Sequence, residues 1–352
     1  MKEHERSFSG RLLDWWDQHG RKDLPWQHPR TAYRVWVSEI MLQQTQVKTV
    51  IPYFNRFVDR FPDVQTLAAA PVDEVLACWS GLGYYARARN LLKTARICLN
   101  DNDGRLPETP EALAALPGIG QSTANAIYSQ AYNKPATILD GNVKRVLARY
   151  FAIEGWPGKS AVHKQLWALA DQLLPAKRGA DYSQALMDLG ATLCSRGKPD
   201  CGQCPVKGNC KAFSTDTVTR FPESRPRQVM AEKSFRMLIL TDHNGRVLLE
   251  RRPPSGIWGG LWSLPEDDDK QATQKRLGVD DGVLKSLPRI QHQLTHIRMT
   301  IQPLIGHTEL PPTGVECTPD QNWFGPRDWL ALGLPKPVRQ LLETHLGNRE
   351  ND

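Results

Sequence analysis

Four cysteines near the middle of the chain constrain its fold more than any other feature. Cys194, Cys201, Cys204 and Cys210 follow the spacing C-x6-C-x2-C-x5-C. Thiolates this close along a chain can surround one metal centre, and sites with four thiolates bind zinc or an iron–sulfur cluster. Zinc sites usually contain two C-x2-C pairs, whereas this stretch contains one. The uneven spacing therefore favours a [4Fe–4S] cluster over zinc.

Disulfides or buried thiols are the alternatives to a metal site. Disulfide frameworks stabilise small secreted domains, whereas this chain has 352 residues and begins MKEHERSFSG, without an apolar leader. No apolar run is long enough to span a bilayer. We therefore expect a soluble cytoplasmic protein with no membrane partner, in which the thiols stay reduced.

The positive charge of the chain is confined to one part of it. The formal net charge is +7, all of it within residues 1–226, and residues 227–352 are neutral. A local excess of Lys and Arg fits a partner with a phosphate backbone. Many proteins with neutral partners are as basic, so charge alone does not identify nucleic acid.

The periodicity of apolar residues changes along the chain and predicts two kinds of domain. Segments 10–20, 33–49, 72–80 and 84–99 repeat apolar residues at helical spacing, with Pro and Gly between them. Residues 212–233 are polar, aperiodic and predicted to be a linker. Short β-like runs follow at 235–241, 247–250, 297–305 and 322–324, and then a helix at 338–346. The sequence predicts an all-α domain followed by an α+β domain.

The stretch LPGIGQSTA, residues 116–124, is a helix-hairpin-helix signature. We expect Gly118 and Gly120 to form the turn and Ser122 to begin the second helix. The amides of such a hairpin can bind a DNA phosphate. An ordinary helix corner is the alternative, and the Asp-Gly-Asn segment about twenty residues later makes that alternative less attractive.

Two further segments carry residues suited to DNA bases. The turn GLGYY, residues 81–85, offers Leu82 and Tyr84 as wedges for a base stack, and two arginines follow it. Tyr85 is equally compatible with a core position. Gln44 and Thr45 provide an amide and a hydroxyl for base edges.

Two carboxylates stand out by their context. Glu39 has Val35 and Leu42 as neighbours on its helical face, so burial should raise its pKa and keep it protonated as a general acid. Asp140 follows an apolar run at a helix N-terminus, where it should be ionised. Such a pair can cleave a glycosidic bond. Each residue alone has an ordinary interpretation, as a solvated helix carboxylate and as an N-cap.

The order of these motifs resembles a known family. The segment WVSEIMLQQTQV (36–47), the GLGYY turn, LPGIG-x-x-TA, LDGNVKRVLAR (139–149) and the four cysteines occur in the same order in MutY-type adenine DNA glycosylases of the endonuclease III superfamily. The resemblance implies an all-α helix-hairpin-helix domain with an iron–sulfur loop, followed by a Nudix-like domain. It also implies a monomer that removes adenine mispaired with 8-oxoguanine or guanine in double-stranded DNA, in association with the nucleoid.

The resemblance also implies roles for individual residues. Glu39 matches the acid that protonates adenine and then helps to activate water, and Asp140 matches the carboxylate that stabilises the sugar cation. Asn142 matches a polar residue that supports them. The resemblance places Leu24 and Trp26 at the adenine pocket, and around the oxidised guanine and the vacated stack it places Gln44, Thr45, Leu82 and Tyr84.

The chain departs from the family pattern at two positions that bear on function. Bifunctional relatives carry lysine where this chain has Ser122, which implies a monofunctional enzyme. Many relatives carry Phe-Ser-His where residues 294–296 read Leu-Thr-His, so Thr295 and His296 keep the hydroxyl and the imidazole but the aromatic ring is lost.

The implied domains are a glycosylase domain, 1–226, and a Nudix-like 8-oxoguanine-recognition domain, 234–352. The first divides into a six-helix part, about 30–135, and an iron–sulfur part, 1–29 with 136–215. Residues 260–266 begin like a Nudix box, but the acidic cluster that holds Mg²⁺ is missing at 274–277.

Two other functions compete with this interpretation. An endonuclease III-like glycosylase and lyase for oxidised pyrimidines is disfavoured by Ser122 and by the second domain. A redox-sensing DNA-binding factor is disfavoured by the paired Glu39 and Asp140.

Overall fold

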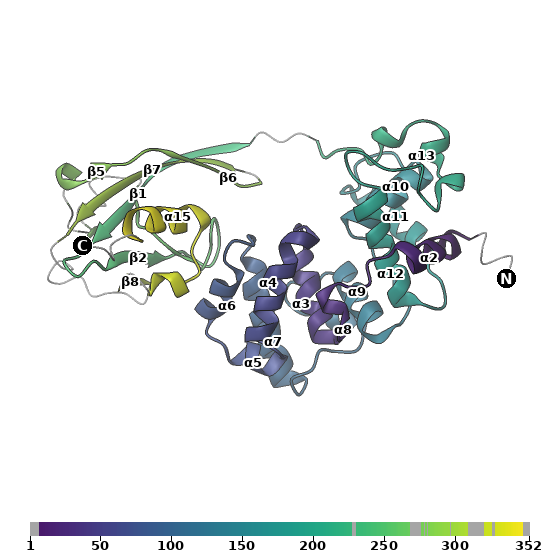
Figure 1. Ribbon diagram of the computed structural model, residues 1–352, viewed down its shortest axis with the longest axis horizontal. Helices are drawn as coiled ribbons and strands as arrows, with labels where there is room; N and C mark the ends of the chain where they lie inside the picture. Colours follow the sequence, from purple (N-terminus) through teal and green to yellow (C-terminus); the bar gives the residue numbers. More distant parts are fainter. Residues whose placement is uncertain are drawn as a thin grey trace. The chain divides into compact units, whose positions relative to one another are not determined.

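The computed structural model describes residues 7–226, 230–267, 276–277, 279, 281–295, 297–308, 320–325 and 328–347. The chain forms two compact units, Met1–Ala69 with Asn90–Arg227 and Ala70–Arg89 with Gln228–Asp352. Helices build the first unit, and a sheet with helices builds the second (Figure 1). The predicted order of an all-α fold followed by an α+β fold is confirmed.

The first unit is a bundle of helices joined by short turns. Its described helices are α2 (Phe8–His19), α3 (Ala32–Leu42), α4 (Val47–Arg60), α5 (Val64–Ala69), α8 (Pro110–Ala114), α9 (Gln121–Tyr132), α10 (Gly141–Phe151), α11 (Ser160–Gln172), α12 (Gly179–Asp188) and α13 (Lys211–Ser214). Helix α7 (Ala86–Asp101) runs from the second unit into the first. The helix α9 is central, because it contacts α3, α8 and α12 (Figure 1).

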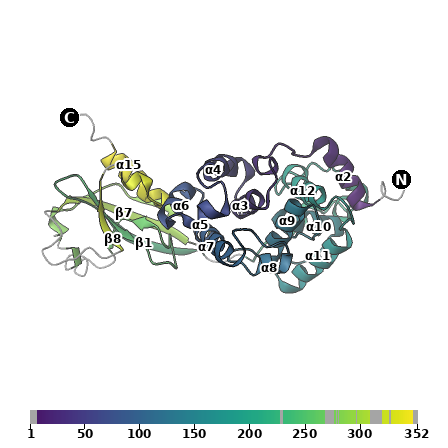
Figure 2. The same ribbon diagram turned by 90° about the horizontal axis from the view of Figure 1, so that it is seen from below.

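The N-terminal helix packs against segments that lie far along the chain. Leu12 and Trp16 of α2 share a core with Leu147 of α10, Leu166 of α11 and Leu186 of α12. Cys194 and Cys204 pack against the same core. The cysteine loop and α2 therefore pack against the same core, and α2 lies beside α12 (Figure 2).

The segment predicted as one helix at 33–49 is two helices. Helix α3 ends at Leu42 and α4 begins at Val47. Between them Gln44 adopts a left-handed conformation with φ 57°, and the Thr45 N–H donates to the Leu42 carbonyl at 3.2 Å. The periodicity continues across this turn, which explains why the sequence alone suggested no break.

The described parts of the predicted linker 212–233, residues 212–226 and 230–233, are more ordered than their composition indicates. They contain the end of α13, a 3₁₀ turn at Val218–Arg220 and the beginning of the first strand at Ala231. Phe221 is buried, and the Arg149 Nε donates to the carbonyls of Val218 at 3.1 Å and Phe221 at 2.9 Å. Tertiary contacts therefore hold a stretch that lacks hydrophobic periodicity.

The second unit is built on a mixed sheet. Its strands are β1 (Ala231–Thr241), β2 (Val247–Arg251), β3 (Trp262–Ser263), β4 (Glu266–Asp267), β5 (Lys285–Ser286), β6 (Ile290–Gln293), β7 (Ile297–His307) and β8 (Gln321–Phe324). The main order is β3-β2-β1-β7-β5, and β1 pairs with β7 in parallel while the other pairs are antiparallel.

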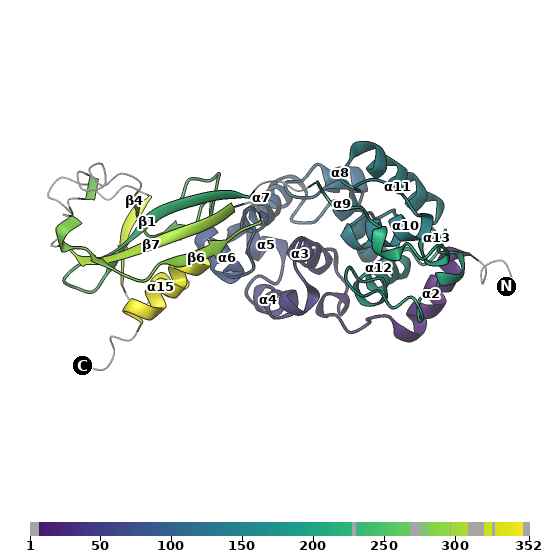
Figure 3. The same ribbon diagram turned by 90° about the horizontal axis from the view of Figure 1, so that it is seen from above.

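Helices α15 (Lys336–Leu346) and α6 (Val72–Trp79) accompany this sheet in the described part of the second unit. Helix α15 lies to one side of the strands, with Val338, Leu341 and Leu342 buried (Figures 2 and 3). Helix α6 contacts the 3₁₀ turn Trp329–Ala331. None of the helices in the described ranges has the length and apolarity needed to cross a membrane.

Candidate active site and cysteine cavity

A cavity of about 890 Å³ lies in the first unit. Its walls come from the stretch before α3, the end of α3 and the turn after it, the N-termini of α9 and α10, and the end of α12. The predicted site residues that line it are Leu24, Trp26, Glu39, Gln44, Thr45, Ser122, Asp140 and Asn142. The fold thus brings together residues that are more than one hundred positions apart in the sequence.

Glu39 lies on the last turn of α3, with the neighbouring Ser38 and Ile40 buried. Burial raises the pKa of its carboxyl to about 7, and the negative charge of Asp140 adds to this effect. A hydrogen bond from the Gln130 Nε2 to its Oε1, 2.9 Å long, acts in the opposite direction. The raised pKa predicted from the apolar context is confirmed, and the group can hold or release a proton near neutral pH.

Asp140 is the N-cap of α10, and its Oδ1 accepts a hydrogen bond from the Val143 N–H at 2.8 Å. Its Oδ2 accepts one from the Asn142 Nδ2 at 3.2 Å. Burial nevertheless raises the pKa of Asp140, while these bonds and the charge of Arg145 oppose the rise. We predicted an ionised group from the helix N-terminus alone. That ionised state stays a prediction, and the upward direction of the pKa follows from the burial of this N-terminus inside the molecule.

Asn142 connects the cavity to the cysteine loop through one arginine. Its Oδ1 accepts from the Arg145 Nη2 at 2.9 Å, and the same nitrogen donates to the Gly190 carbonyl at 2.6 Å. The Arg145 Nε donates to the Cys194 carbonyl at 2.8 Å. A Cβ at Gly190 would lie 2.6 Å from the Asn142 Cβ, so a side chain there would push the two segments apart.

One wall of the cavity is fixed by a buried carboxylate, Asp188. It accepts hydrogen bonds from the Trp16 Nε1 at 3.2 Å, the Arg21 Nη2 at 2.6 Å and the Gln184 Nε2 at 2.8 Å. Arg21 and Gln184 both line the cavity. Since Asp188 is 1% exposed, these donors replace the water that a carboxylate needs.

The predicted pocket residues Leu24 and Trp26 are buried beside the same cavity. Leu24 precedes the 3₁₀ turn Pro25–Gln27 and Trp26 lies within it. The Trp26 ring packs edge-on against Phe54, with 5.4 Å between ring centres. Both side chains therefore offer the cavity a rigid apolar surface.

The hairpin between α8 and α9 has the predicted form, with one difference. Gly118 has φ 79°, the left-handed conformation that favours glycine, whereas Gly120 is an extended N-cap of α9. Backbone freedom is therefore required at Gly118 only. The Ser122 Oγ accepts a hydrogen bond from the Leu139 N–H at 2.9 Å, which ties the start of α9 to the residue before Asp140.

The remaining predicted contacts lie in the second unit. Leu82 is buried, and Tyr84 is 47% exposed with φ 50°. The hydroxyls of Tyr84 and Thr295 share a hydrogen bond of 2.7 Å. Leu82 is thus less available as a wedge than Tyr84, and His296 lies outside the described residues.

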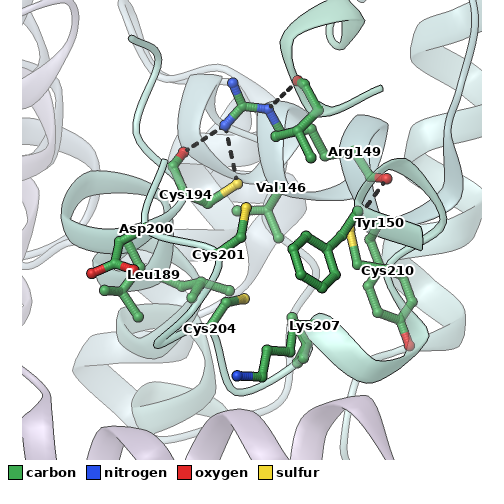
Figure 4. Close-up of a pocket in the computed structure, with 14 residues that line it drawn as sticks. Val146, Arg149, Tyr150, Leu189, Cys194, Asp200, Cys201, Cys204, Lys207 and Cys210 are labelled. Atoms are coloured by element: carbon green, nitrogen blue, oxygen red, sulfur yellow. Dashed lines mark hydrogen bonds between the residues drawn. The ribbon is translucent and has the colours of Figure 1, made fainter. Parts of the chain in front are cut away.

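The four cysteines line a second, smaller cavity of about 30 Å³ in the first unit, and their sulfur atoms lie around the same space (Figure 4). The Arg149 Nη1 donates to the Cys194 Sγ at 3.4 Å, and the Cys210 Sγ lies 3.6 Å from the Arg149 carbonyl. Across the described ranges, no three His, Cys, Asp or Glu side chains form a group that could hold a single metal ion. The thiols surround a space and do not converge on one point.

Comparison with known proteins identifies the family. Residues 37–172 match the model of the HhH-GPD superfamily of base excision DNA repair proteins, and residues 236–344 match the NUDIX domain. The adenine DNA glycosylase of Buchnera aphidicola subsp. Schizaphis graminum is 35% identical over 341 residues, covering 96% of this chain and 98% of the relative. The Homo sapiens adenine DNA glycosylase is 33% identical, covering 97% of this chain and 74% of the relative. The chain belongs to the adenine DNA glycosylase family.

Solved structures support the fold of the first unit of this family member. A thermostable thymine-DNA glycosylase is 30% identical with a TM-score of 0.55, covering 61% of this chain and 98% of that structure. An endonuclease III bound non-covalently to DNA gives a TM-score of 0.52 at 20% identity with the same coverage, which shows the fold alone.

The Nudix-like unit of this adenine DNA glycosylase family member pairs its carboxylates with cations. Glu266 forms an ion pair with Arg252 at 2.7 Å and a longer one with Lys233 at 3.3 Å. Asp267 forms one with Arg236 at 2.9 Å. These two carboxylates are thus engaged with cationic side chains of the same unit.

Sequence analysis missed several residues of this glycosylase site. Gln130 was detectable in principle, because it follows Ala126 and Ile127 on the apolar face of a helix, where a lone amide needs a partner. Arg21 and Gln184 carried no such signal. Their place in the cavity depends on their shared contact with Asp188.

Proposed function

We propose that this chain hydrolyses the N-glycosidic bond of adenine paired with 8-oxoguanine or guanine in duplex DNA, as a monofunctional enzyme of base excision repair. The observation that carries the proposal is the presence of Glu39, with a pKa of about 7, and Asp140 in one cavity. Membership of the adenine DNA glycosylase family supports the choice of adenine.

The proposed reaction uses the two carboxyl groups in sequence. Glu39 donates its proton to the adenine ring while the bond between C1′ and N9 breaks, and the bonding electrons leave with the base. The sugar becomes cationic, and the Asp140 carboxylate stabilises it. Water then adds to C1′ and gives a proton to the Glu39 carboxylate, which restores the acid.

Asn142 and Arg145 assist the charged form of Asp140. Asn142 donates to the Asp140 Oδ2, and the guanidinium of Arg145 lowers the pKa of Asp140 against the effect of burial. The Asn142 amide is itself held by Arg145. We therefore assign Asn142 a supporting role in the site.

Ser122 provides no amine for a Schiff base, so the reaction should end at hydrolysis without cleavage of the strand. Its hydroxyl instead accepts the Leu139 N–H and supports the segment that carries Asp140. The missing amine and the structural role of the hydroxyl both support the assignment as a monofunctional enzyme.

Recognition of the DNA is divided between the two units in this proposal. The hairpin amides around Gly118 and Gly120 would bind a phosphate, and Leu24 and Trp26 would hold the flipped adenine. Gln44, Thr45, Leu82 and Tyr84 would contact the opposite base and the vacated stack. Thr295 and His296 would read the 8-oxoguanine, a role suited to a unit without net charge.

We assign the four cysteines to a [4Fe–4S] cluster. All four line one cavity, and their uneven spacing, C-x6-C-x2-C-x5-C, suits a cluster, the four-thiolate centre that spreads its ligands. The cluster would order the loop 194–210, from which Arg196 reaches the larger cavity. We further propose a monomer that acts in the cytoplasm on the nucleoid.

A single-turnover assay on a duplex with an A·8-oxoguanine pair tests the proposal. We expect free adenine and an abasic strand that breaks only after alkali, and no release by Glu39→Gln, which should still bind the duplex. Excision of an oxidised pyrimidine with spontaneous nicking would instead support an endonuclease III-like enzyme. Binding without any excision would support a DNA-binding factor.

A further inference from the structure

Gln130 is a buried amide that contacts the proposed acid, Glu39, directly. The residue lies on α9, is 3% exposed and follows the buried Ala126 and Ile127. Its Nε2 lies 2.9 Å from the Glu39 Oε1. Burying an amide costs free energy unless the amide forms hydrogen bonds. An apolar side chain would pack here at a lower cost, so the amide is better explained by its bond to Glu39 than by packing.

We propose that Gln130 is a positioning residue for Glu39, which holds the carboxyl so that its proton is carried on Oε2. An ionised carboxylate can only accept, so the amide N–H must face Oε1 in that state. The neutral acid keeps this bond when Oε2 carries the proton and loses it when Oε1 does. This inference rests on the proposed function, in which Glu39 is the acid.

The surroundings of Glu39 make this bond consequential. The charged residues that share its cavity are Asp140 and Arg145 of α10, Arg21 before α3, Lys48 of α4 and Arg196 of the cysteine loop. Burial and Asp140 both favour the protonated form of Glu39, and the bond from Gln130 favours the ionised form. Glu39 needs both forms, because it gives a proton to the base and later takes one from water.

Helix α9 holds Gln130 in a fixed place. One residue earlier, the Ser129 and Ser183 hydroxyls share a buried hydrogen bond of 3.0 Å to α12. The Asn125 Nδ2 donates to the Thr137 carbonyl at 2.6 Å. The reach of the Gln130 side chain is therefore set by the packing of the helix, and Ser129 offers a buried polar neighbour as a control.

The test is the pH dependence of single-turnover adenine release by the full-length protein. Wild type, Gln130→Leu and the control Ser129→Ala would be compared on the A·8-oxoguanine duplex, with Gln130→Met as a second variant if Leu impairs folding. Without the bond that favours the carboxylate, the alkaline limb should move upward by about one pH unit. The rate on the acidic plateau should fall several-fold, because the acid loses its fixed orientation.

The outcomes separate this inference from the proposed function. If both Gln130 variants keep the wild-type limb and plateau, the positioning role is overturned while the glycosylase assignment stands. If Ser129→Ala shifts the limb as far as Gln130→Leu does, the shift is a general effect of α9 and the role is likewise overturned. Failure of the wild type to release adenine would refute the proposed function itself.

Discussion

Replacing Glu39 by glutamine should stabilise the protein while abolishing its activity. The carboxyl has a pKa of about 7 in the folded protein, against 4.5 as its ordinary value. The folded state therefore binds more protons than the unfolded state between these two values. It follows that the wild type loses stability as the pH rises through this window, whereas the neutral glutamine does not.

The difference between the ordinary pKa of Glu39, 4.5, and its pKa in the folded protein, about 7, sets the size of the stability difference. At about 1.4 kcal/mol per pH unit, it gives about 3.5 kcal/mol above pH 7 as an upper limit. Water in the cavity screens part of this cost, so we expect a gain of at least about 1 kcal/mol at pH 8. At pH 4.5 the folded carboxyl is protonated and the unfolded one is half ionised, so the two proteins should differ in stability by less than about 0.5 kcal/mol.

Thermal unfolding of the helical unit at pH 4.5 and pH 8, followed by circular dichroism, measures this difference. A gain of about 1–3 kcal/mol corresponds to a rise in Tm of several °C at pH 8 for a unit of this size. Glu108→Gln, at an exposed position, is the control and should behave like the wild type. An equal Tm difference at both pH values, or a less stable Glu39→Gln at pH 8, would refute the reasoning.

Three further changes test other parts of the structure. Asp188→Ala leaves buried donors without their acceptor and should lower the free energy of unfolding by about 3–5 kcal/mol, measured by thermal unfolding. Cys201→Ser should lose the iron measured in purified protein, whereas Cys78→Ser should keep it. Thr295→Ala should lower the ratio of single-turnover rates on A·8-oxoguanine and A·G duplexes several-fold, and an unchanged ratio would contradict its role in reading the opposite base.

Hydrophobic periodicity predicted the helices and strands well where packing follows the local pattern. It did not detect the break after Leu42, because Gln44 adopts a left-handed conformation without the glycine that usually marks one. The ordered part of 212–233 was also missed. Its backbone is held by hydrogen bonds from Arg149, a residue about seventy positions earlier, and the composition of a segment cannot predict so distant a partner.

In the site, too, properties set by neighbours along the chain could be predicted, whereas properties set by tertiary contacts could not. The raised pKa of Glu39 could be predicted because its apolar neighbours lie on the same helix. The pKa of Asp140 could not, since the depth of its helix N-terminus depends on the packing of the whole unit. Gln130 and Asp188 act through partners on other elements, so their contributions became visible only in the folded chain.

The contacts of Asp188 impose an order on the folding of this protein during its synthesis. Its donors Trp16 and Arg21 leave the ribosome more than 160 residues before the carboxylate that they bind. During synthesis α2 therefore lacks its final partner until α12 has emerged from the ribosome. The cavity wall held by Asp188 can form only after α12 has been synthesised. A nascent chain that ends before α12 would therefore contain Glu39 and Asp140 but not the complete cavity around them.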